Sequence, residues 1–329
     1  MQEKIAVVLL NLGGPDSLDA VEPFLFNLFN DPDIINFPLS FLFRERLARL
    51  ISSKRAPRVQ EQYKKIGGKS PLKEHTLRQA EMLEERLNKD FPARVFVAMR
   101  YWEPFTEKAV KQIADEGISR VILLPLYPHY SKATTHSSVS EWERKVAELN
   151  GACKFQTDLI ESYYEFPAYI DALIERVTEG LEQFPESERG DVHLLFSAHG
   201  TPMKLVREGD PYSDHIKKTV ASVMNRGGYI NEHSLCYQSK VGPQKWLRPS
   251  TPEMIESLAK RGVKKMLAIP VAFASDHLET LFEVGMEFKR MALDTGVEKF
   301  EVTKGLNDSP AFIEALSQLV LERIREKRS

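Results

Sequence analysis

The stretch LLFSAHGTP at 194–202 places His199 at the end of an apolar run, directly before a glycine, a threonine and a proline. A neutral imidazole accepts protons near neutral pH and ligates borderline metal ions. The alternative is a core histidine whose ring is satisfied by neighbouring backbone, which is the commoner role of a single histidine. Because His199 lies where the apolar run stops, it is the first candidate for proton transfer or metal binding.

A second group of chemically active side chains lies in the run SDHLETLFEVGMEFKR at 275–290. The run opens on a Ser-Asp helix start and has helical periodicity. Glu279, Glu283 and Glu287 recur every four residues, so they share one stripe beside an apolar face. A stripe of this kind is often only a solvated helix face. The functional interpretation is a carboxylate track that attracts hydrated cations and carries protons.

The elements that must position these residues are short apolar strands that alternate with longer amphipathic helices. We expect strands at 5–10, 94–99, 120–127, 192–198, 233–239 and 265–273, and helices at 76–89, 165–184 and 250–262. This alternation is typical of βαβ units around a parallel sheet that is covered on both faces.

The strands form two sets of three, and each ends in polar, aromatic or glycine residues. Parallel strands deliver such residues to a crevice at their carboxyl ends. We therefore expect an α/β protein of two similar doubly wound lobes, each a parallel sheet flanked by helices, which face a central cleft. The lobes are expected at 1–160 and 161–329, with the C-terminal helix able to pack back on the first lobe.

Composition excludes several classes of function. The 45 Lys and Arg residues nearly balance the 47 Asp and Glu residues, so the net charge of −2 offers no general attraction to nucleic acid. Cys153 and Cys236 form no CxxC pair, which suits a reducing compartment and predicts a cytoplasmic protein. No apolar run is long enough for a transmembrane segment or a secretory signal. The chain also lacks the GxSxG and GxGxxG turns of serine hydrolases and dinucleotide-binding folds.

The run LLFSAHGTPMKLVREGDPY at 194–212 resembles the signature of the ferrochelatase family. The resemblance continues in order through LNLGGP, PRVQEQYKKIGGKSPL, RYWEPFTE, YPHYSKATTHSS, YQSKVGPQKWL, FASDHLETLFE and GLNDSP. It implies a chelatase-like fold and a lyase that inserts Fe²⁺ into a porphyrin with release of two protons, the last step of haem biosynthesis. Protoporphyrin IX is the expected substrate, because NLGGP and the apolar run at 36–43 look more like the branch that uses it.

The resemblance also implies roles for individual residues. His199, Glu279 and His277 are expected to be catalytic, and His199 and Glu279 would form a sparse N/O site from which the metal can pass on. Asp276 and Glu283 are expected on a metal or proton path, whereas Glu287 is expected to be solvated. The residues expected at the porphyrin are Leu12, Arg100, Tyr101, Tyr127, Ser131 and Trp246, with Arg100 on the side opposite His199.

Basic residues in 44–58, together with Ser131 and Lys132, could pair with porphyrin propionates, the alternative being a solvated amphipathic helix. The apolar run at 36–43 is expected to form a lip over the cleft with only peripheral membrane contact. Two cysteines cannot supply four thiolate ligands, so no iron–sulfur cluster and no other tightly bound cofactor is expected. The expected partners are a porphyrin and ferrous iron, the latter as substrate.

Three alternatives remain from the sequence. A ferrochelatase that prefers coproporphyrin would share every motif above. A cobalt or nickel chelatase would share the fold and the histidine at the strand end, but is expected to lack the combination of QSKVGP, Trp246 and SDHLET. A protein that only binds haem or a metal is the alternative outside enzymes.

Overall fold

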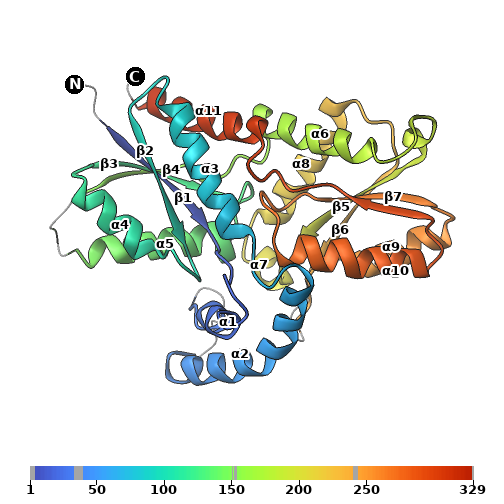
Figure 1. The fold of residues 1–329 in the computed structure, drawn as a ribbon, viewed down its shortest axis with the longest axis horizontal. Coiled ribbons are helices and arrows are strands. Elements are labelled where there is room, and N and C mark those ends of the chain that lie inside the picture. The colour runs from blue at the N-terminus through green and yellow to red at the C-terminus, as the bar shows by residue number, and fades with distance from the viewer. Residues whose placement is uncertain (1–3, 33–39, 150, 152–153, 240–243, 328–329) are drawn as a thin grey trace. The chain divides into compact units, whose positions relative to one another are not determined.

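The computed structural model describes residues 4–32, 40–149, 151, 154–239 and 244–327 (Figure 1). The chain divides into two compact units. Unit 1 comprises 1–127, 131–162 and 316–329, and unit 2 comprises 128–130 and 163–315. The last helix, α11 (Pro310–Glu326), therefore begins in unit 2 and ends in unit 1.

The sheet of unit 1 has the strand order β2-β1-β3-β4, and all of its strands are parallel. Its strands are β1 (Ile5–Asn11), β2 (Ala93–Met99), β3 (Arg120–Pro125) and β4 (Gln156–Leu159). Helix α3 (Leu72–Leu87) lies on one face, and α4 (Thr106–Asp115) and α5 (Ser137–Ala147) lie on the other (Figure 1). Strand β1 is buried along its whole length, as expected for a central parallel strand covered on both faces.

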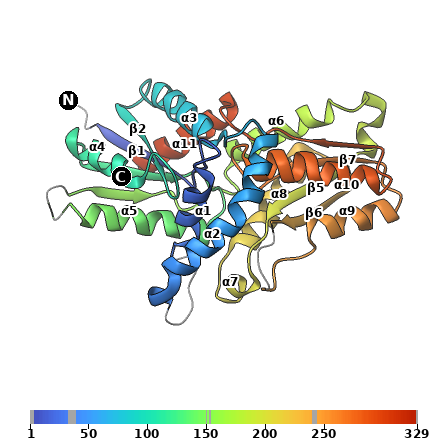
Figure 2. The ribbon, with the colours of Figure 1, turned by 60° about the horizontal axis from the view of Figure 1, so that its bottom comes forward.

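Two further helices of unit 1 follow β1. They are α1 (Val21–Phe29) and α2 (Ser40–Lys65), which pack against each other (Figure 2). A short π-helical turn, η1 (Lys132–His136), leads into α5.

The sheet of unit 2 repeats this topology with the order β6-β5-β7-β8, again all parallel. Its strands are β5 (His193–His199), β6 (His233–Gln238), β7 (Lys265–Pro270) and β8 (Lys299–Val302). Its helical elements are α6 (Pro167–Leu181), η2 (Glu186–Asp191), α7 (Met203–Arg207), α8 (Tyr212–Gly227), α9 (Thr251–Lys260), η3 (Glu279–Phe288) and α10 (Lys289–Asp294). Helices α6 and α8 lie on one face of the sheet, and α9 and α10 lie on the other (Figure 1).

Each unit has its own hydrophobic core between its sheet and its helices. In unit 1, Leu10, Phe96 and Trp142 belong to one buried cluster. In unit 2, Leu195 and Phe300 belong to another. The buried strands of each sheet therefore fix the positions of the residues at their carboxyl ends. These strands are β1, β2 and β3 in unit 1, and β5, β6 and β7 in unit 2.

The expected fold class is confirmed, since each unit is a parallel sheet flanked by helices. All six predicted strands are present. Two more, β4 and β8, escaped prediction because each has only four residues, carries polar side chains and is incompletely buried, which gives a weak apolar signal. Helix α9 begins where predicted: Ser250 and Glu253 form a reciprocal capping box.

Candidate functional site

His199 is the last residue of β5, and its side chain is 37% exposed although the rest of the strand is buried. Its Nδ1 lies 2.6 Å from the carbonyl oxygen of Gly200, to which it can donate. The Tyr212 hydroxyl donates to the backbone oxygen of His199 at 3.0 Å. With Nδ1 engaged, the free Nε2 is the nitrogen available for chemistry, and it lies 3.6 Å from Oε1 of Glu279.

The opposite charges of His199 and Glu279 stabilise each other. Burial alone would lower the pKa of His199, but the Glu279 carboxylate outweighs it and, with the Gly200 carbonyl, raises the pKa of His199 to about 9. Burial alone would raise the pKa of Glu279, and His199 and His277 instead hold it well below its usual range. Without substrate the imidazolium is therefore favoured at neutral pH, whereas the sequence pointed to a neutral imidazole.

His277 lies in the same cluster. Its Nε2 is 3.9 Å from Oε2 of Glu279, and its Nδ1 is 3.2 Å from the backbone oxygen of Ser275. The ring of Phe273 is close to both histidines, with its centroid 4.4 Å from that of His277 and 6.2 Å from that of His199. The three predicted catalytic residues thus lie together at the carboxyl ends of β5 and β7, beside an apolar ring.

Ser239 joins the carboxylates of Glu279 and Glu283. It directly follows β6, and its hydroxyl oxygen lies 3.0 Å from Oε2 of Glu279 and 2.7 Å from Oε2 of Glu283. Its backbone N–H donates to Oε1 of Glu283 at 3.2 Å. Burial, and then the charge of Glu279, raise the pKa of Glu283. Sequence reasoning did not select Ser239, because a single serine at a strand end carries no spacing signal.

The predicted helix at 275–290 is a π-helix over Glu279–Phe288 that continues as α10. Such wide turns are rare and are frequent at functional sites. Gly285 fits this geometry, since a Cβ at that position would lie 3.3 Å from the carbonyl oxygen of Thr280, five residues earlier. Spacing by four residues did not distinguish an α-helix from a π-helix.

Asp276 and Glu287 lie outside the cluster that His199, Glu279 and His277 form. Both carboxylate oxygens of Asp276 accept hydrogen bonds, from the Thr280 hydroxyl, the Gly305 N–H and the Asn307 amide. Asp276 therefore fastens the start of η3 to the segment that follows β8. Glu287 is exposed on η3.

Trp246 is held by backbone pairing against the segment that follows His199, opposite Pro202. The N–H of Met203 donates to the Lys245 carbonyl at 2.8 Å, and the N–H of Leu247 donates to the Thr201 carbonyl at 3.0 Å. A Cβ at Gly200 would lie 3.3 Å from the indole ring and 2.8 Å from the Gln238 carbonyl oxygen. Gly200 thus permits the indole of Trp246 to approach β5 closely.

In unit 1, the predicted porphyrin-contacting residues Leu12, Arg100 and Tyr101 follow β1 and β2. The backbone N–H of Arg100 donates to the Asn11 carbonyl, and that of Tyr101 donates to the Leu12 carbonyl, both at 2.9 Å. These two hydrogen bonds extend the pairing of β1 with β2 beyond the strands. They bring the three residues together at the carboxyl end of the sheet of unit 1.

Arg100 is held by a buried ion network. Its guanidinium lies 3.0 Å from the fully buried Asp31 carboxylate and 3.5 Å from that of Glu141, and it donates to the Ser137 hydroxyl at 2.9 Å. The Tyr101 hydroxyl donates to the same oxygen of Asp31 at 2.6 Å. Only 1% of Tyr101 is exposed, so its ring serves the interior of unit 1. Sequence reasoning missed Asp31, which lies in a polar segment without a motif.

Tyr127 and Ser131 follow β3. The Tyr127 hydroxyl is 3.5 Å from that of Ser138, and the side chain is half-buried. Ser131 is buried and accepts a hydrogen bond from the N–H of Ala133, which caps η1. Its hydroxyl is thus engaged within unit 1.

The basic residues predicted at 44–58 lie on α2. The guanidinium of Arg49 lies over the ring of Phe26, and that of Arg55 lies over the ring of Phe29, 4.9 and 5.4 Å from the ring centroids. These two arginines pack α2 on α1. The predicted lip at 36–43 falls largely outside the described residues, as does most of QSKVGP, since 33–39 and 240–243 are not described.

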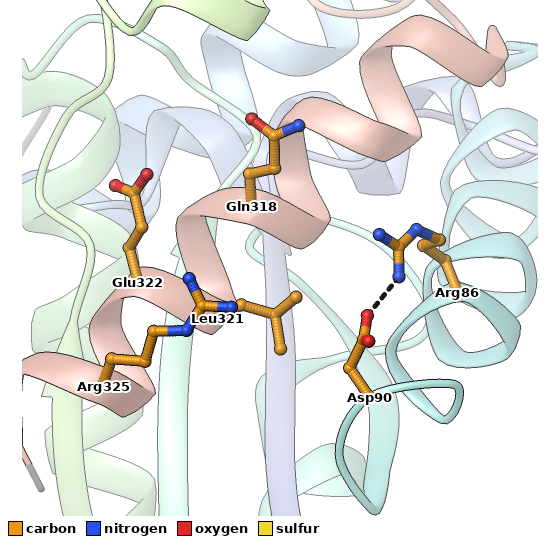
Figure 3. A pocket seen from close by; sticks show the side chains of 6 residues that line it. All are labelled: Arg86, Asp90, Gln318, Leu321, Glu322 and Arg325. Atoms are coloured by element: carbon orange, nitrogen blue, oxygen red, sulfur yellow. Dashed lines mark hydrogen bonds and ion pairs between the residues drawn. The ribbon is translucent and has the colours of Figure 1, made fainter.

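Within the described ranges, no group of three or more His, Cys, Asp or Glu side chains is arranged to hold a metal ion. The same ranges contain no helix long and apolar enough to cross a membrane. A cavity of about 370 Å³ in unit 1 is lined by Arg86, Asp90, Gln318, Leu321, Glu322 and Arg325 (Figure 3). Its lining includes none of the predicted site residues, so this cavity is not the candidate site.

Comparison with known proteins identifies the family. The ferrochelatase family model matches residues 4–324. The ferrochelatase of Geotalea uraniireducens is 51% identical over 320 residues, which cover 97% of this chain and 98% of that protein. The ferrochelatase of Aquifex aeolicus is 46% identical over 98% of this chain and its own full length.

Solved structures agree on the fold. SirB from Bacillus subtilis, solved with Fe³⁺, matches with a TM-score of 0.55 at 13% identity, over 97% of this chain and 95% of that one. CbiX, described as the terminal enzyme of sirohaem biosynthesis in denitrifying bacteria, matches with a TM-score of 0.51 at 12% identity, over 98% of this chain and 99% of that one. With a family match over nearly its whole length and relatives at about half identity, the chain belongs to the ferrochelatase family, enzymes of the lyase class that insert ferrous iron into a porphyrin.

Proposed function

We propose that this protein inserts Fe²⁺ into protoporphyrin IX to form protohaem, the last step of haem biosynthesis. The observation that carries the proposal is the pairing of His199 with Glu279, at 3.6 Å, where β5 ends and η3 begins. The reaction breaks two pyrrole N–H bonds and forms bonds from the ring nitrogens to iron, with no transfer of electrons. It therefore needs a proton acceptor and a carboxylate-lined approach for a hydrated cation, and this cluster has candidates for both.

His199 is the proposed acceptor of the pyrrole protons through Nε2, because Nδ1 is engaged by Gly200. Its raised pKa means that Nε2 carries a proton at rest, so we propose that the charge of Fe²⁺ arriving at Glu279 first displaces this proton to solvent. The neutral ring then takes the two pyrrole protons in turn and passes each of them to solvent. Glu279 and His277 are the proposed partners that guide Fe²⁺ to the reacting nitrogens. A sparse pair of N and O ligands suits an ion that must be released, since a closed set of four would retain it. Glu283 lies one turn further along η3 and continues the proposed row of carboxylates away from His199.

Binding of the macrocycle is proposed to use apolar and cationic residues at the strand ends. Phe273 offers flat area beside His199, and Trp246 offers it beside Gly200, the next residue. Leu12, Arg100 and Tyr127 are the proposed contacts from unit 1. Tyr101 is proposed to position Arg100 rather than touch the ring, because it is buried on Asp31. Binding energy spent on the periphery of the ring can bend it and expose the pyrrole lone pairs.

The preference for protoporphyrin over coproporphyrin rests on the NLGGP run and the apolar residues at 36–43. A substrate with fewer propionates needs fewer cationic partners, which agrees with the use of Arg49 and Arg55 in packing α2 on α1. Comparison of kcat/KM for the two porphyrins tests this choice. A large preference for coproporphyrin would overturn it.

Ferrous iron is a substrate in this account, and no resident cofactor is proposed. We further propose that the protein acts in the cytoplasm. A peripheral contact with the membrane through 36–43 would help an apolar porphyrin to enter. Co-sedimentation with anionic vesicles, with and without substitutions in that run, measures this contact.

The function is tested by absorbance spectroscopy without oxygen. Substoichiometric protein mixed with protoporphyrin IX and Fe²⁺ should convert the free-base bands to those of haem over many turnovers. Binding of porphyrin without turnover would support a carrier instead. Turnover confined to Co²⁺ or Ni²⁺ with another tetrapyrrole would support a sister chelatase.

A further inference from the structure

Ser239 has two unusual properties that its sequence position did not reveal. Its φ angle is +65°, a left-handed conformation that costs free energy in any residue other than glycine. Its hydroxyl and N–H make three contacts with the carboxylates of Glu279 and Glu283. A strained conformation persists where surrounding contacts enforce it, and such sites cluster where geometry matters for function.

The contacts are unequal for the two glutamates. The one hydroxyl proton of Ser239 is shared between Oε2 of Glu283, at 2.7 Å, and Oε2 of Glu279, at 3.0 Å, whereas the backbone N–H donates to Glu283 alone. Glu279 receives only the hydroxyl, at its Oε2, while its Oε1 faces His199. Like charges four residues apart on a helix repel each other. A hydroxyl placed between the two carboxylates opposes that repulsion and fixes the direction of each.

We propose that Ser239 is a positioning residue for iron delivery, whose hydroxyl holds the Glu279 carboxylate with one oxygen turned toward His199. The inference rests on the proposed function. Ser239 lies at the end of β6, next to β5 in the sheet, so the rigid sheet fixes the carboxylate of a side chain that η3 carries. Without the hydroxyl, Glu279 samples other rotamers and meets Fe²⁺ in fewer productive arrangements.

Two substitutions separate the hydroxyl from the backbone conformation. Ser239→Ala removes the hydroxyl and keeps the strained conformation, whereas Ser239→Gly removes the hydroxyl and relieves the strain. Both retain the N–H that anchors Glu283. Each should raise KM for Fe²⁺ by about tenfold, as expected for the loss of a hydrogen bond to a charged group, while KM for porphyrin stays unchanged.

A double-mutant cycle tests the route through Glu279. If Ser239 acts through that carboxylate, Ser239→Ala should add little to the loss caused by Glu279→Gln. Glu287→Gln is the matched control, because Glu287 lies on the same helix in an exposed position, and its effect should combine independently with that of Ser239→Ala.

The outcomes distinguish the inference from the proposed function. A wild-type protein that makes no haem would overturn both. Wild-type turnover with an unchanged KM for Fe²⁺ in both Ser239 variants would overturn the inference alone. So would normal activity in Ser239→Gly with impaired activity in Ser239→Ala, because the backbone conformation would then be what matters. Melting temperatures of all variants verify that losses of activity occur in folded protein.

Discussion

At the scale of single residues, Glu279 is the side chain on which most contacts converge, since both histidines and Ser239 lie within 4 Å of its carboxylate oxygens. Glu279→Gln keeps the shape and removes the charge. We expect kcat/KM for Fe²⁺ to fall on the order of 10²-fold, with the deficit largest at low iron concentration. Initial rates over an iron series measure this, with Glu287→Gln as a control that should remain near wild type. A Glu279→Gln variant with the wild-type dependence on iron would count against iron guidance.

The buried network around Asp31 makes a separate prediction for stability. Asp31→Asn leaves the Arg100 guanidinium, 13% exposed, without its nearest counter-charge. Breaking one partner of a buried pair should lower the free energy of unfolding by roughly 3 kcal/mol. Chemical denaturation measures the loss. The matched control is Asp16→Asn, whose pair with Lys73 is partly exposed and should cost about 1 kcal/mol or less. Equal losses in the two variants would contradict the predicted role of Asp31.

The sequence reveals a site residue when its role shows in the residues next to it along the chain. His199 and Glu279 stand out because each follows an apolar pattern and lies in a long motif. Ser239 and Asp31 do not, because their partners are 40 and 70 residues away along the chain, in Glu279 and Tyr101. A lone serine or aspartate has the same local pattern whether it is solvated or engaged, so only the fold distinguishes the two.

At the scale of elements, α9 gives the clearest test of a local signal. Ser250→Ala removes the capping hydroxyl that accepts from Glu253 and should lower the free energy of unfolding by about 1 kcal/mol. Iron insertion should be unaffected, because the cap makes no contact with the His199 cluster. Ser257→Ala in the exposed interior of the same helix is the control and should be neutral or slightly stabilising. A Ser250→Ala variant as stable as wild type would show that the cap contributes nothing.

Prediction from periodicity succeeded for long elements and failed for short or irregular ones. Strands β1 and β5 are buried apolar runs with a strong signal, whereas β4 and β8 are four-residue edge strands that are incompletely buried. The register of η3 was not predictable either, because its start is held by the hydrogen bonds that Asp276 accepts from Gly305 and Asn307, which are distant along the chain. Both failures arise where neighbours, rather than the local pattern, decide the conformation.

At the scale of the whole molecule, the two units share one strand order, so corresponding strands deliver their carboxyl ends in the same way. Sequence patterns revealed this repetition as two sets of three strands. The structure assigns residues 128–130 to unit 2, and no sequence pattern predicted this assignment. That segment carries His129, which is buried between Tyr169 and Tyr212.

His129 makes global stability depend on pH. Its Nε2 donates to Thr219, whose own hydroxyl donates to Tyr164, and its buried Nδ1 has no hydrogen-bond partner among the described residues. Burial, with a smaller effect of His215, lowers the pKa of His129 from 6.5 to about 3. In the unfolded chain, His129 therefore becomes protonated below about pH 6.5. In the folded chain, it stays neutral until about pH 3. The free energy of unfolding should fall across that interval, by up to about 1.4 kcal/mol per pH unit.

Denaturation curves between pH 7 and pH 4 measure this slope. His129→Gln should reduce the slope by up to one proton, whatever its effect on stability at pH 7. His193, whose pKa burial lowers to about 4, should contribute a second and smaller share. An unchanged slope in His129→Gln would mean that His129 titrates alike in the folded and unfolded chain.

The role of His199 as acceptor of the pyrrole protons is measured in the His199→Ala variant. Melting temperature, porphyrin affinity and kcat should be measured on one preparation. Because the side chain is 37% exposed at a strand end, we expect nearly intact folding and porphyrin binding, with kcat lower by about 10²–10⁴-fold, as for loss of a positioned general base. A variant that melts at lower temperature yet keeps its kcat per folded molecule would show that His199 is structural and does not take the pyrrole protons.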